Sequence, residues 1–87
     1  MQIFYSSQFS RDYRHLPSEI KERARKREKI FRQDPFNSQL KTHKLKGKFD
    51  GFSAFSVDFR YRIIFKFQDK STIRFYAIGD HSIYKKL

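Results

Sequence analysis

Apolar residues recur with a helical period near the start of the chain. Phe9, Tyr13 and Leu16 are separated by four and then three residues, so a helix would present them on one face. Ser6 or Ser7 can cap this helix, because a serine hydroxyl accepts a hydrogen bond from a free backbone N–H at the helix start. The pattern predicts a first helix that ends near Leu16.

A second helix follows Pro17, which breaks the first helix and suits the opening turn of the next. We predict that it runs from about residue 18 to residue 33. It stops at Asp34-Pro35, because the residue before a proline avoids helical geometry. Its apolar stripe consists of Ile20, Ala24, Ile30 and Phe31.

Shorter alternating patterns fill the rest of the chain and are typical of strands. The expected strands cover residues 2–5, 52–59, 61–67 and 72–78. Residues 36–51 show no clear period and indicate a loop or the ragged start of a strand, while the polar residues 68–71 form a hairpin turn.

This order, β-α-α-β-β-β, predicts an α+β fold. Two N-terminal helices would pack on one face of a mainly antiparallel sheet of about four strands. We treat residues 1–87 as one domain, since a chain of this length is enough for one and no more. The second face of the sheet would then meet water or a ligand.

The chain carries a large net positive charge, and several of its cations fall in the expected strands. Arg60, Arg62, Lys66 and Arg74 fall within the sheet segments, which is more charge than a purely structural face needs. The chain has 20 Lys and Arg against nine Asp and Glu, a formal net charge of +11. Self-repulsion on this scale favours a polyanionic partner. Nucleic acid is the leading candidate, followed by an acidic protein and then by an anionic membrane.

Composition argues against several other kinds of site. The chain has no Cys, so disulfides and thiolate metal sites are absent, and a small domain without them is typical of a reducing cytoplasm. No apolar run approaches the ~20 residues that span a bilayer. The histidines, His15, His43 and His81, lack the spacing of a metal-ligand motif, so we expect neither a metal nor another cofactor.

The remaining candidates suit cleavage of RNA through the ribose 2′-OH. That reaction needs a base for the 2′-OH proton, cations for the charge on phosphorus and an acid for the leaving 5′-oxygen. Histidine can act as acid or base near neutral pH, and arginine offers phosphate a planar fork of donors. Residues of suitable type are His43, Lys44 and Lys46 before the main strands, Arg62 within them, and His81 and Tyr84 at their end.

Three short motifs resemble those of a known family. They are His43-Lys44-Leu45-Lys46-Gly47, Tyr61-Arg62-Ile63-Ile64-Phe65 and Ile78-Gly79-Asp80-His81-Ser82-Ile83-Tyr84. Their order and intervals, together with the helical N-terminal half, are similar to those of the RelE/YoeB/YafQ ribonuclease toxins of the RelE/ParE superfamily. The resemblance implies a microbial RNase-like fold, metal-independent cleavage of mRNA in the ribosomal A site and neutralisation by a cognate antitoxin. The net charge fits an antitoxin whose acidic segment wraps the toxin, and we expect the toxin alone to be a monomer.

The resemblance also implies roles for individual residues. Arg62 matches the sheet arginine that stabilises the scissile phosphate, and His81 matches the C-terminal histidine that looks like the general acid. His43 stands where YafQ-like toxins have a histidine before Leu-x-Gly, and it is our candidate base. Tyr84 resembles the terminal aromatic residue that stacks on the RNA or orients it.

The chain departs from the family pattern in the base region. Two lysines of RelE align with Ser53 and Phe55, and the glutamate base of YoeB lies near Gln39. We therefore expect cationic support from Lys44 and Lys46.

Other cations are candidates for contacts with RNA phosphates. They are Lys44, Lys46, Arg60, Lys26 and Lys29. The last two lie on the second predicted helix. Its polar surface is either a solvated face with ion pairs such as Glu28–Arg32 or a face that contacts phosphates.

Each candidate residue also has a structural interpretation. These are an exposed loop residue for His43, a turn cap for His81, an ion pair with Asp58 for Arg62 and core packing for Tyr84. Two other functions stay open as well. One is a ParE-like toxin that acts on gyrase, which has little need of the two histidines, and the other is a non-catalytic basic module that binds nucleic acid.

Overall fold

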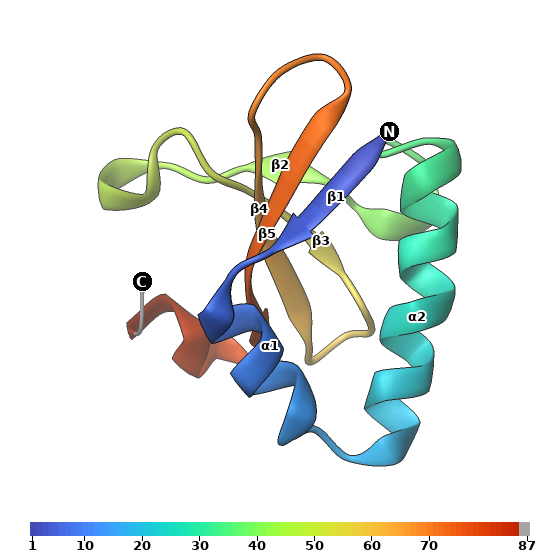
Figure 1. Cartoon of the computed structure of the whole chain (residues 1–87). Coiled ribbons are helices and arrows are strands. Elements are labelled where there is room, and N and C mark those ends of the chain that lie inside the picture. Colours follow the sequence, from blue (N-terminus) through green and yellow to red (C-terminus); the bar gives the residue numbers. More distant parts are fainter. Residues whose placement is uncertain (86–87) are drawn as a thin grey trace.

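Five strands form one mixed sheet in the computed structural model of the chain, which describes residues 1–85 (Figure 1). The strands are β1 (Gln2–Tyr5), β2 (His43–Lys44), β3 (Ser53–Ser56), β4 (Arg62–Phe67) and β5 (Thr72–Gly79). Their order is β1-β5-β4-β3-β2, with β1 parallel to β5 and the other pairs antiparallel. The predicted α+β class and mainly antiparallel sheet are confirmed. The sheet has five strands rather than about four, because part of the 36–51 segment pairs with β3 as β2.

Two helices, α1 (Ser7–Arg14) and α2 (Ser18–Gln33), cover one face of the sheet (Figure 1). Ser6 caps α1, since its hydroxyl accepts a hydrogen bond from the Phe9 N–H at 3.0 Å. The second helix has the predicted bounds and begins directly after Pro17. Neither helix is long and apolar enough to cross a membrane. Short 3-10 turns complete the described chain, namely η1 (Ser38–Leu40), η2 (Gly47–Phe49) and η3 (His81–Lys85).

The core between the helices and the sheet is built on aromatic rings. Phe31 of α2 is fully buried, with ring centroids 4.7 Å from Phe55, 4.9 Å from Phe65 and 5.5 Å from Phe75. These three partners come from β3, β4 and β5, so one helical side chain ties α2 to the middle of the sheet. Aromatic pairs at such distances stabilise a core beyond their buried area.

The second sheet face is partly covered, although the sequence led us to expect water or a ligand over it. Its buried cluster and the side chains packed around it are Ala54, Ile64, Ala77, Ile83, Leu45, Phe52 and Tyr84. A shift in strand pairing contributes, because Ile64 pairs with Ala77 whereas Phe65 pairs with Phe75. Tyr76 is thus an extra residue in β5, as in a β-bulge. The 45–52 segment and η3 leave only the margins of this face open.

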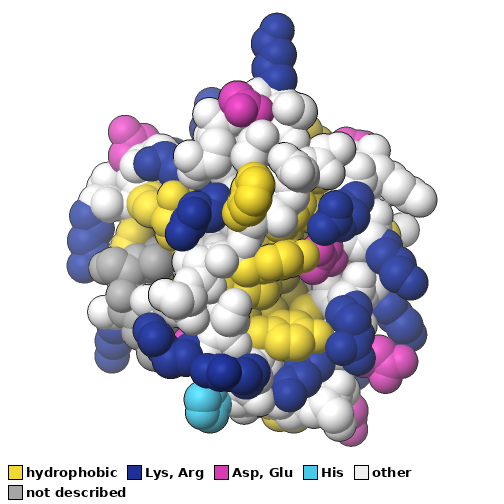
Figure 2. All heavy atoms as spheres, in the orientation of Figure 1, with side chains coloured by type: hydrophobic (Ala, Val, Ile, Leu, Met, Phe, Trp, Pro, Cys, Tyr) yellow, Lys and Arg dark blue, Asp and Glu magenta, His cyan; other side chains and the backbone are white. Residues whose placement is uncertain are grey.

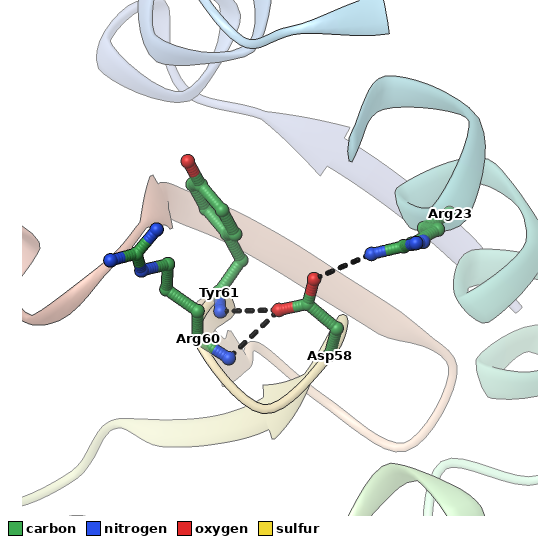
Figure 3. A network of polar contacts seen from close by, with 4 residues as sticks. All are labelled: Arg23, Asp58, Arg60 and Tyr61. Carbon is green, nitrogen blue, oxygen red and sulfur yellow. Dashed lines mark hydrogen bonds and ion pairs between the residues drawn. The ribbon is translucent and has the colours of Figure 1, made fainter. Parts of the chain in front are cut away.

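The strand that alternation predicted through Phe59 ends earlier, at Ser56. The chain turns here because the Asp58 carboxylate accepts hydrogen bonds from the backbone N–H groups of Arg60 and Tyr61, both at 2.8 Å (Figure 3). An aspartate that bonds the backbone a few residues ahead favours a turn over continued strand pairing. As a result Phe59 is 90% exposed and does not join the core.

Asp58 also joins this turn to α2 through an ion pair with Arg23, at an N–O distance of 3.0 Å (Figure 3). Burial alone would raise the pKa of Asp58, but the backbone N–H groups of Tyr61 and Arg60 and the Arg23 guanidinium outweigh it and lower that pKa. A carboxyl with a lowered pKa in the folded state stabilises the protein above the ordinary aspartate value of about 3.9. That stabilisation is lost as pH falls through the lowered pKa.

Replacement of Asp58 by asparagine should therefore remove part of the acid sensitivity of the fold. We expect the melting temperature of Asp58→Asn, followed by circular dichroism, to be lower than that of the wild type at neutral pH. The difference should shrink as pH falls below about 4, where the wild-type carboxyl also becomes neutral. A difference that stays constant down to about pH 2 would contradict this assignment.

Candidate functional site

Strand register places Arg62 and His43 on the second sheet face. Arg62 lies opposite Ser56 across the β3–β4 pair, and His43 lies opposite Ala54 across the β2–β3 pair. Because Ala54 and Ser56 are two residues apart, all four side chains point to one face. Two strand spacings and two residues separate the backbones of Arg62 and His43, which amounts to about 12 Å. The two side chains can therefore approach one substrate from different sides.

Arg62 is held by a hydroxyl and not by an acid. Its guanidinium Nη1 donates a hydrogen bond to Ser56 Oγ at 3.0 Å, and both groups are partly buried. None of the ion pairs between residues 1–85 includes Arg62, and Asp58 pairs with Arg23 instead. The structural alternative of an Arg62–Asp58 pair is therefore wrong. Most of the guanidinium fork stays available to an anion, which suits arginine as a phosphate ligand.

His81 begins η3, directly after the end of β5. Gly79 lies opposite Arg62 in the β4–β5 pair, so His81 follows that position by two residues. The Asp80 carboxylate accepts a hydrogen bond from the Ser82 N–H at 2.9 Å, which opens the turn and lowers the pKa of Asp80. Electrostatic interactions with Arg60 and His81 lower the pKa of Asp80 further. Figure 3 shows the Arg60 side chain pointing away from Asp58.

Tyr84 connects this turn to the loop before β3. Its ring lies 6.3 Å from the ring of His81 and 5.5 Å from that of Phe49, centroid to centroid. The side chain is half-buried against the cluster around Ile83, so core packing accounts for part of Tyr84. Ile83 of η3 packs closely against Gly79 at the end of β5. A Cβ atom added at Gly79 would lie 2.4 Å from the Ile83 Cγ2 atom, so a larger residue there would displace η3.

His43 is exposed at the edge of the sheet. Its Nδ1 lies 3.0 Å from the Lys41 carbonyl oxygen, and within residues 1–85 the other ring nitrogen makes no hydrogen bond. Alternation along β2 places Lys44 on the opposite face from His43. Lys46 is exposed in the loop that follows. Arg62, His43 and Tyr84 thus lie on the second sheet face. Arg60 lies in the turn between β3 and β4, and His81 lies in the turn that follows β5. Lys46 is near His43 in sequence, and Lys44 is turned to the opposite face.

The candidate lysines of α2 lie elsewhere. Lys26 and Lys29 are exposed on a helix that packs against the other sheet face, so they are not part of the group around Arg62. Residues 1–85 also contain no cluster of three His, Asp or Glu side chains that would hold a metal ion. Sequence reasoning did not find Ser56, whose contact with Arg62 depends on the β3–β4 register.

A hollow that the sequence did not reveal lies between the two helices and β1. It has a volume of about 490 Å³. Its lining residues are Tyr5, Phe9, Ser10, Tyr13, Arg25, Glu28, Lys29 and Arg32. Figure 2 shows apolar side chains in a hollow on this face with Lys and Arg side chains around it. We call this feature the helical groove.

The basic rim of the helical groove is partly neutralised from within. Tyr5 donates a short hydrogen bond to Glu28, and Arg32 donates to the same carboxylate at 3.2 Å. Burial raises the pKa of the Tyr5 hydroxyl, and the hydrogen bond to Glu28 raises it further. Arg25 and Lys29 form no ion pair with any residue from 1 to 85. The groove therefore combines an aromatic floor with available positive charge.

No family model matches the chain, and no curated protein matches it. Several solved structures, however, match this chain in fold. The YafQ structure from E. coli strain BL21(DE3) superposes with a TM-score of 0.79 at 24% identity, covering 95% of this chain and 96% of that one. A chain of the E. coli DinJ–YafQ complex gives a TM-score of 0.66 at 28% identity, covering 94% of this chain and 94% of that one.

A third structural match is to a complex that contains a different toxin. The heterotetrameric YoeB–YefM toxin–antitoxin complex from Staphylococcus aureus gives a TM-score of 0.76 at 18% identity, covering 93% of this chain and 97% of that one. The chain has the fold of the RelE/YoeB/ParE toxin superfamily. The matches cover 95% and 93% of this chain, so nearly all of it shares this fold. The family resemblance inferred from the three motifs is confirmed at the level of structure.

Proposed function

We propose that this protein is the toxin of a type II toxin–antitoxin system and cleaves mRNA on the ribosome as a metal-independent endoribonuclease. One observation carries the catalytic part of this proposal. Arg62 lies on an open margin of the sheet, held by Ser56 and by no acid among residues 1–85, with His81 following the residue opposite it. The likeness in fold to YafQ and YoeB supports the toxin role.

The proposed reaction is a transfer at phosphorus with balanced proton movements. His43 accepts the proton of the ribose 2′-OH, whose oxygen attacks the adjacent phosphorus. Arg62 stabilises the additional negative charge on the phosphoryl oxygens. His81 donates a proton to the leaving 5′-oxygen, so that the products are a 2′,3′-cyclic phosphate and a free 5′-OH. Tyr84 orients the RNA, while Lys46 and Arg60 add positive charge. Lys44, which points to the opposite face of the sheet, would act only on more distant phosphates.

A cognate antitoxin is the proposed protein partner. The solved complexes of YoeB with YefM and of YafQ with DinJ support this assignment. A net charge of +11 favours an acidic antitoxin segment, and the helical groove offers apolar floor and basic rim to such a segment. Lys29 would then serve the antitoxin rather than RNA. We place the free toxin in the cytoplasm as a monomer.

Growth and cleavage assays test the proposed function. Expression of the protein without its antitoxin should arrest bacterial growth, and co-expression of the antitoxin should restore it. Purified protein should cleave mRNA on programmed ribosomes and leave gyrase activity on supercoiled plasmid unchanged. Inhibition of gyrase without cleavage would favour the ParE-like alternative. Normal growth at high levels of folded protein, with RNA binding but no cleavage, would favour a non-catalytic binding module.

A further inference from the structure

Two cations lie side by side on β4 and β5, near the hairpin turn that joins these strands. Lys66 of β4 and Arg74 of β5 are register partners, so their side chains leave the sheet side by side on the same face. Like charges directly opposite each other in an antiparallel pair are destabilising. Neither residue forms an ion pair with any of residues 1–85. A pair of this kind is readily explained if an anion binds to it.

Aromatic rings hold both cations where the strands place them. The Lys66 Nζ lies 4.9 Å from the centroid of the Phe52 ring, and the Arg74 Cζ lies 5.6 Å from that of Tyr76. The two rings touch each other edge to face, with centroids 5.1 Å apart. Cation–π contacts of this kind position a cation without neutralising it. The four side chains, Phe52, Lys66, Arg74 and Tyr76, form what we call the basic–aromatic patch.

The patch lies on the same sheet face as Arg62. Along β4 the side chains of Arg62, Ile64 and Lys66 alternate onto this face, and Ile64 is buried beneath the cluster that includes Ile83. Four residues of strand separate Arg62 from Lys66, which is about 13 Å. An extended RNA strand covers that distance with a few phosphates. Buried side chains in the middle of this face thus separate two charged margins, one at Arg62 and the other at Lys66.

We propose that the basic–aromatic patch is a second RNA contact, which binds the backbone of a single-stranded segment flanking the scissile phosphate at Arg62. This inference rests on the proposed function, because it assigns the same RNA to both margins. Charge decides between the possible partners here. The patch has two cations beside each other that no acid of residues 1–85 neutralises, and aromatic rings next to them. RNA matches both features, because phosphates bind cations and bases stack on aromatic rings.

The test compares two charge-neutralised proteins. Lys66→Gln with Arg74→Gln removes the patch cations, and Arg14→Gln with Lys21→Gln removes the same charge from the helices that cover the other sheet face. The probe is an unstructured single-stranded RNA of about ten nucleotides, within the range of sites for such strands. Binding is measured by fluorescence anisotropy over a series of salt concentrations. Circular dichroism confirms that each variant is folded.

We expect the patch variant to bind the RNA more weakly and with a shallower salt dependence. Loss of two phosphate contacts should reduce the slope of log K against log salt by about 1.4. The helix control should keep the wild-type slope. A further variant, Lys66→Arg with Arg74→Lys, keeps both charges and should also keep that slope. This swap separates the loss of charge from any change in packing.

Each other outcome has a definite meaning. A patch variant with the wild-type slope, an equal loss of slope in the helix control, or no binding of this RNA by the wild type would overturn the patch proposal. Loss of antitoxin binding with unchanged RNA binding would assign the patch to an acidic protein instead. The proposed function fails separately, if wild-type protein binds RNA with the patch yet does not cleave mRNA on ribosomes.

Discussion

Replacement of Arg62 by alanine should reduce the single-turnover rate of mRNA cleavage on programmed ribosomes by about 10²–10³-fold. The reason is that an arginine directed at the phosphate acts mainly in the transition state, where the phosphoryl oxygens gain charge. Ribosome binding should weaken far less, because many other cations of this +11 chain remain. The measurement is the cleavage rate at saturating toxin beside the affinity for the same ribosomes.

Conservative variants show whether the geometry of Arg62 matters as well as its charge. Arg62→Lys should recover only part of the rate, since an ammonium lacks the planar fork that contacts two phosphate oxygens. Ser56→Ala should cause a smaller loss that vanishes in an Arg62→Ala background, because Ser56 acts only by holding the guanidinium. A near-wild-type cleavage rate in Arg62→Ala would remove Arg62 from the proposed mechanism.

The helices were the part of the fold that the sequence predicted best. The second helix has the predicted bounds because Pro17 and Asp34-Pro35 restrict backbone geometry locally, whatever the rest of the chain does. The strands were predicted less well at their ends. Alternation continues through Phe59, but the hydrogen bonds of the Asp58 carboxylate turn the chain before that residue.

The remaining differences depend on contacts between segments far apart in the sequence. β2 has only two residues, and it is a strand because it pairs with β3, not because its residues favour one. The sequence also did not predict that side chains cover the second sheet face. Ile83 and Phe52 lie in turns outside the strands, and only the folded chain shows that these turns place them on that face. The helical groove likewise could not be predicted, because it is lined by Tyr5 of β1 together with residues of α2, which come together only in the folded chain.

The candidate site was predictable as a set of residue types and not as a geometry. Period-two alternation alone puts Arg62, Ile64 and Lys66 on one side of a strand. It does not say that Ser56 is the neighbour of Arg62 or that Arg74 is the neighbour of Lys66, because register is set by the whole sheet. The lysines of α2 were proposed on charge alone, and charge carries no information about which face a helix covers.

Replacement of His81 by alanine should lower the cleavage rate by about 10²–10⁴-fold, the usual contribution of a general acid–base group. If His81 protonates the leaving 5′-oxygen, only its imidazolium form is active, so the wild-type rate should fall as pH rises and the imidazolium loses its proton. That alkaline limb should be absent from His81→Ala. His43→Ala should instead lose the acidic limb, because a base must be neutral to accept a proton. Single-turnover rates on programmed ribosomes over a pH series measure both.

His15→Ala is the matched control for these two variants. His15 is also exposed, and it lies at the end of α1, where its Nδ1 is 2.7 Å from the Arg11 carbonyl oxygen. It lines a hollow that Asp80 and Ser82 also line, so it tests whether any imidazole near this turn would suffice. It should keep the wild-type rate and both limbs of the pH profile. His81→Ala should still bind antitoxin, because His81 does not line the helical groove. An alkaline limb that survives in His81→Ala would show that another group donates the proton, even if the rate had fallen. Tyr84 would then be the first alternative to examine, since its ring lies beside that of His81.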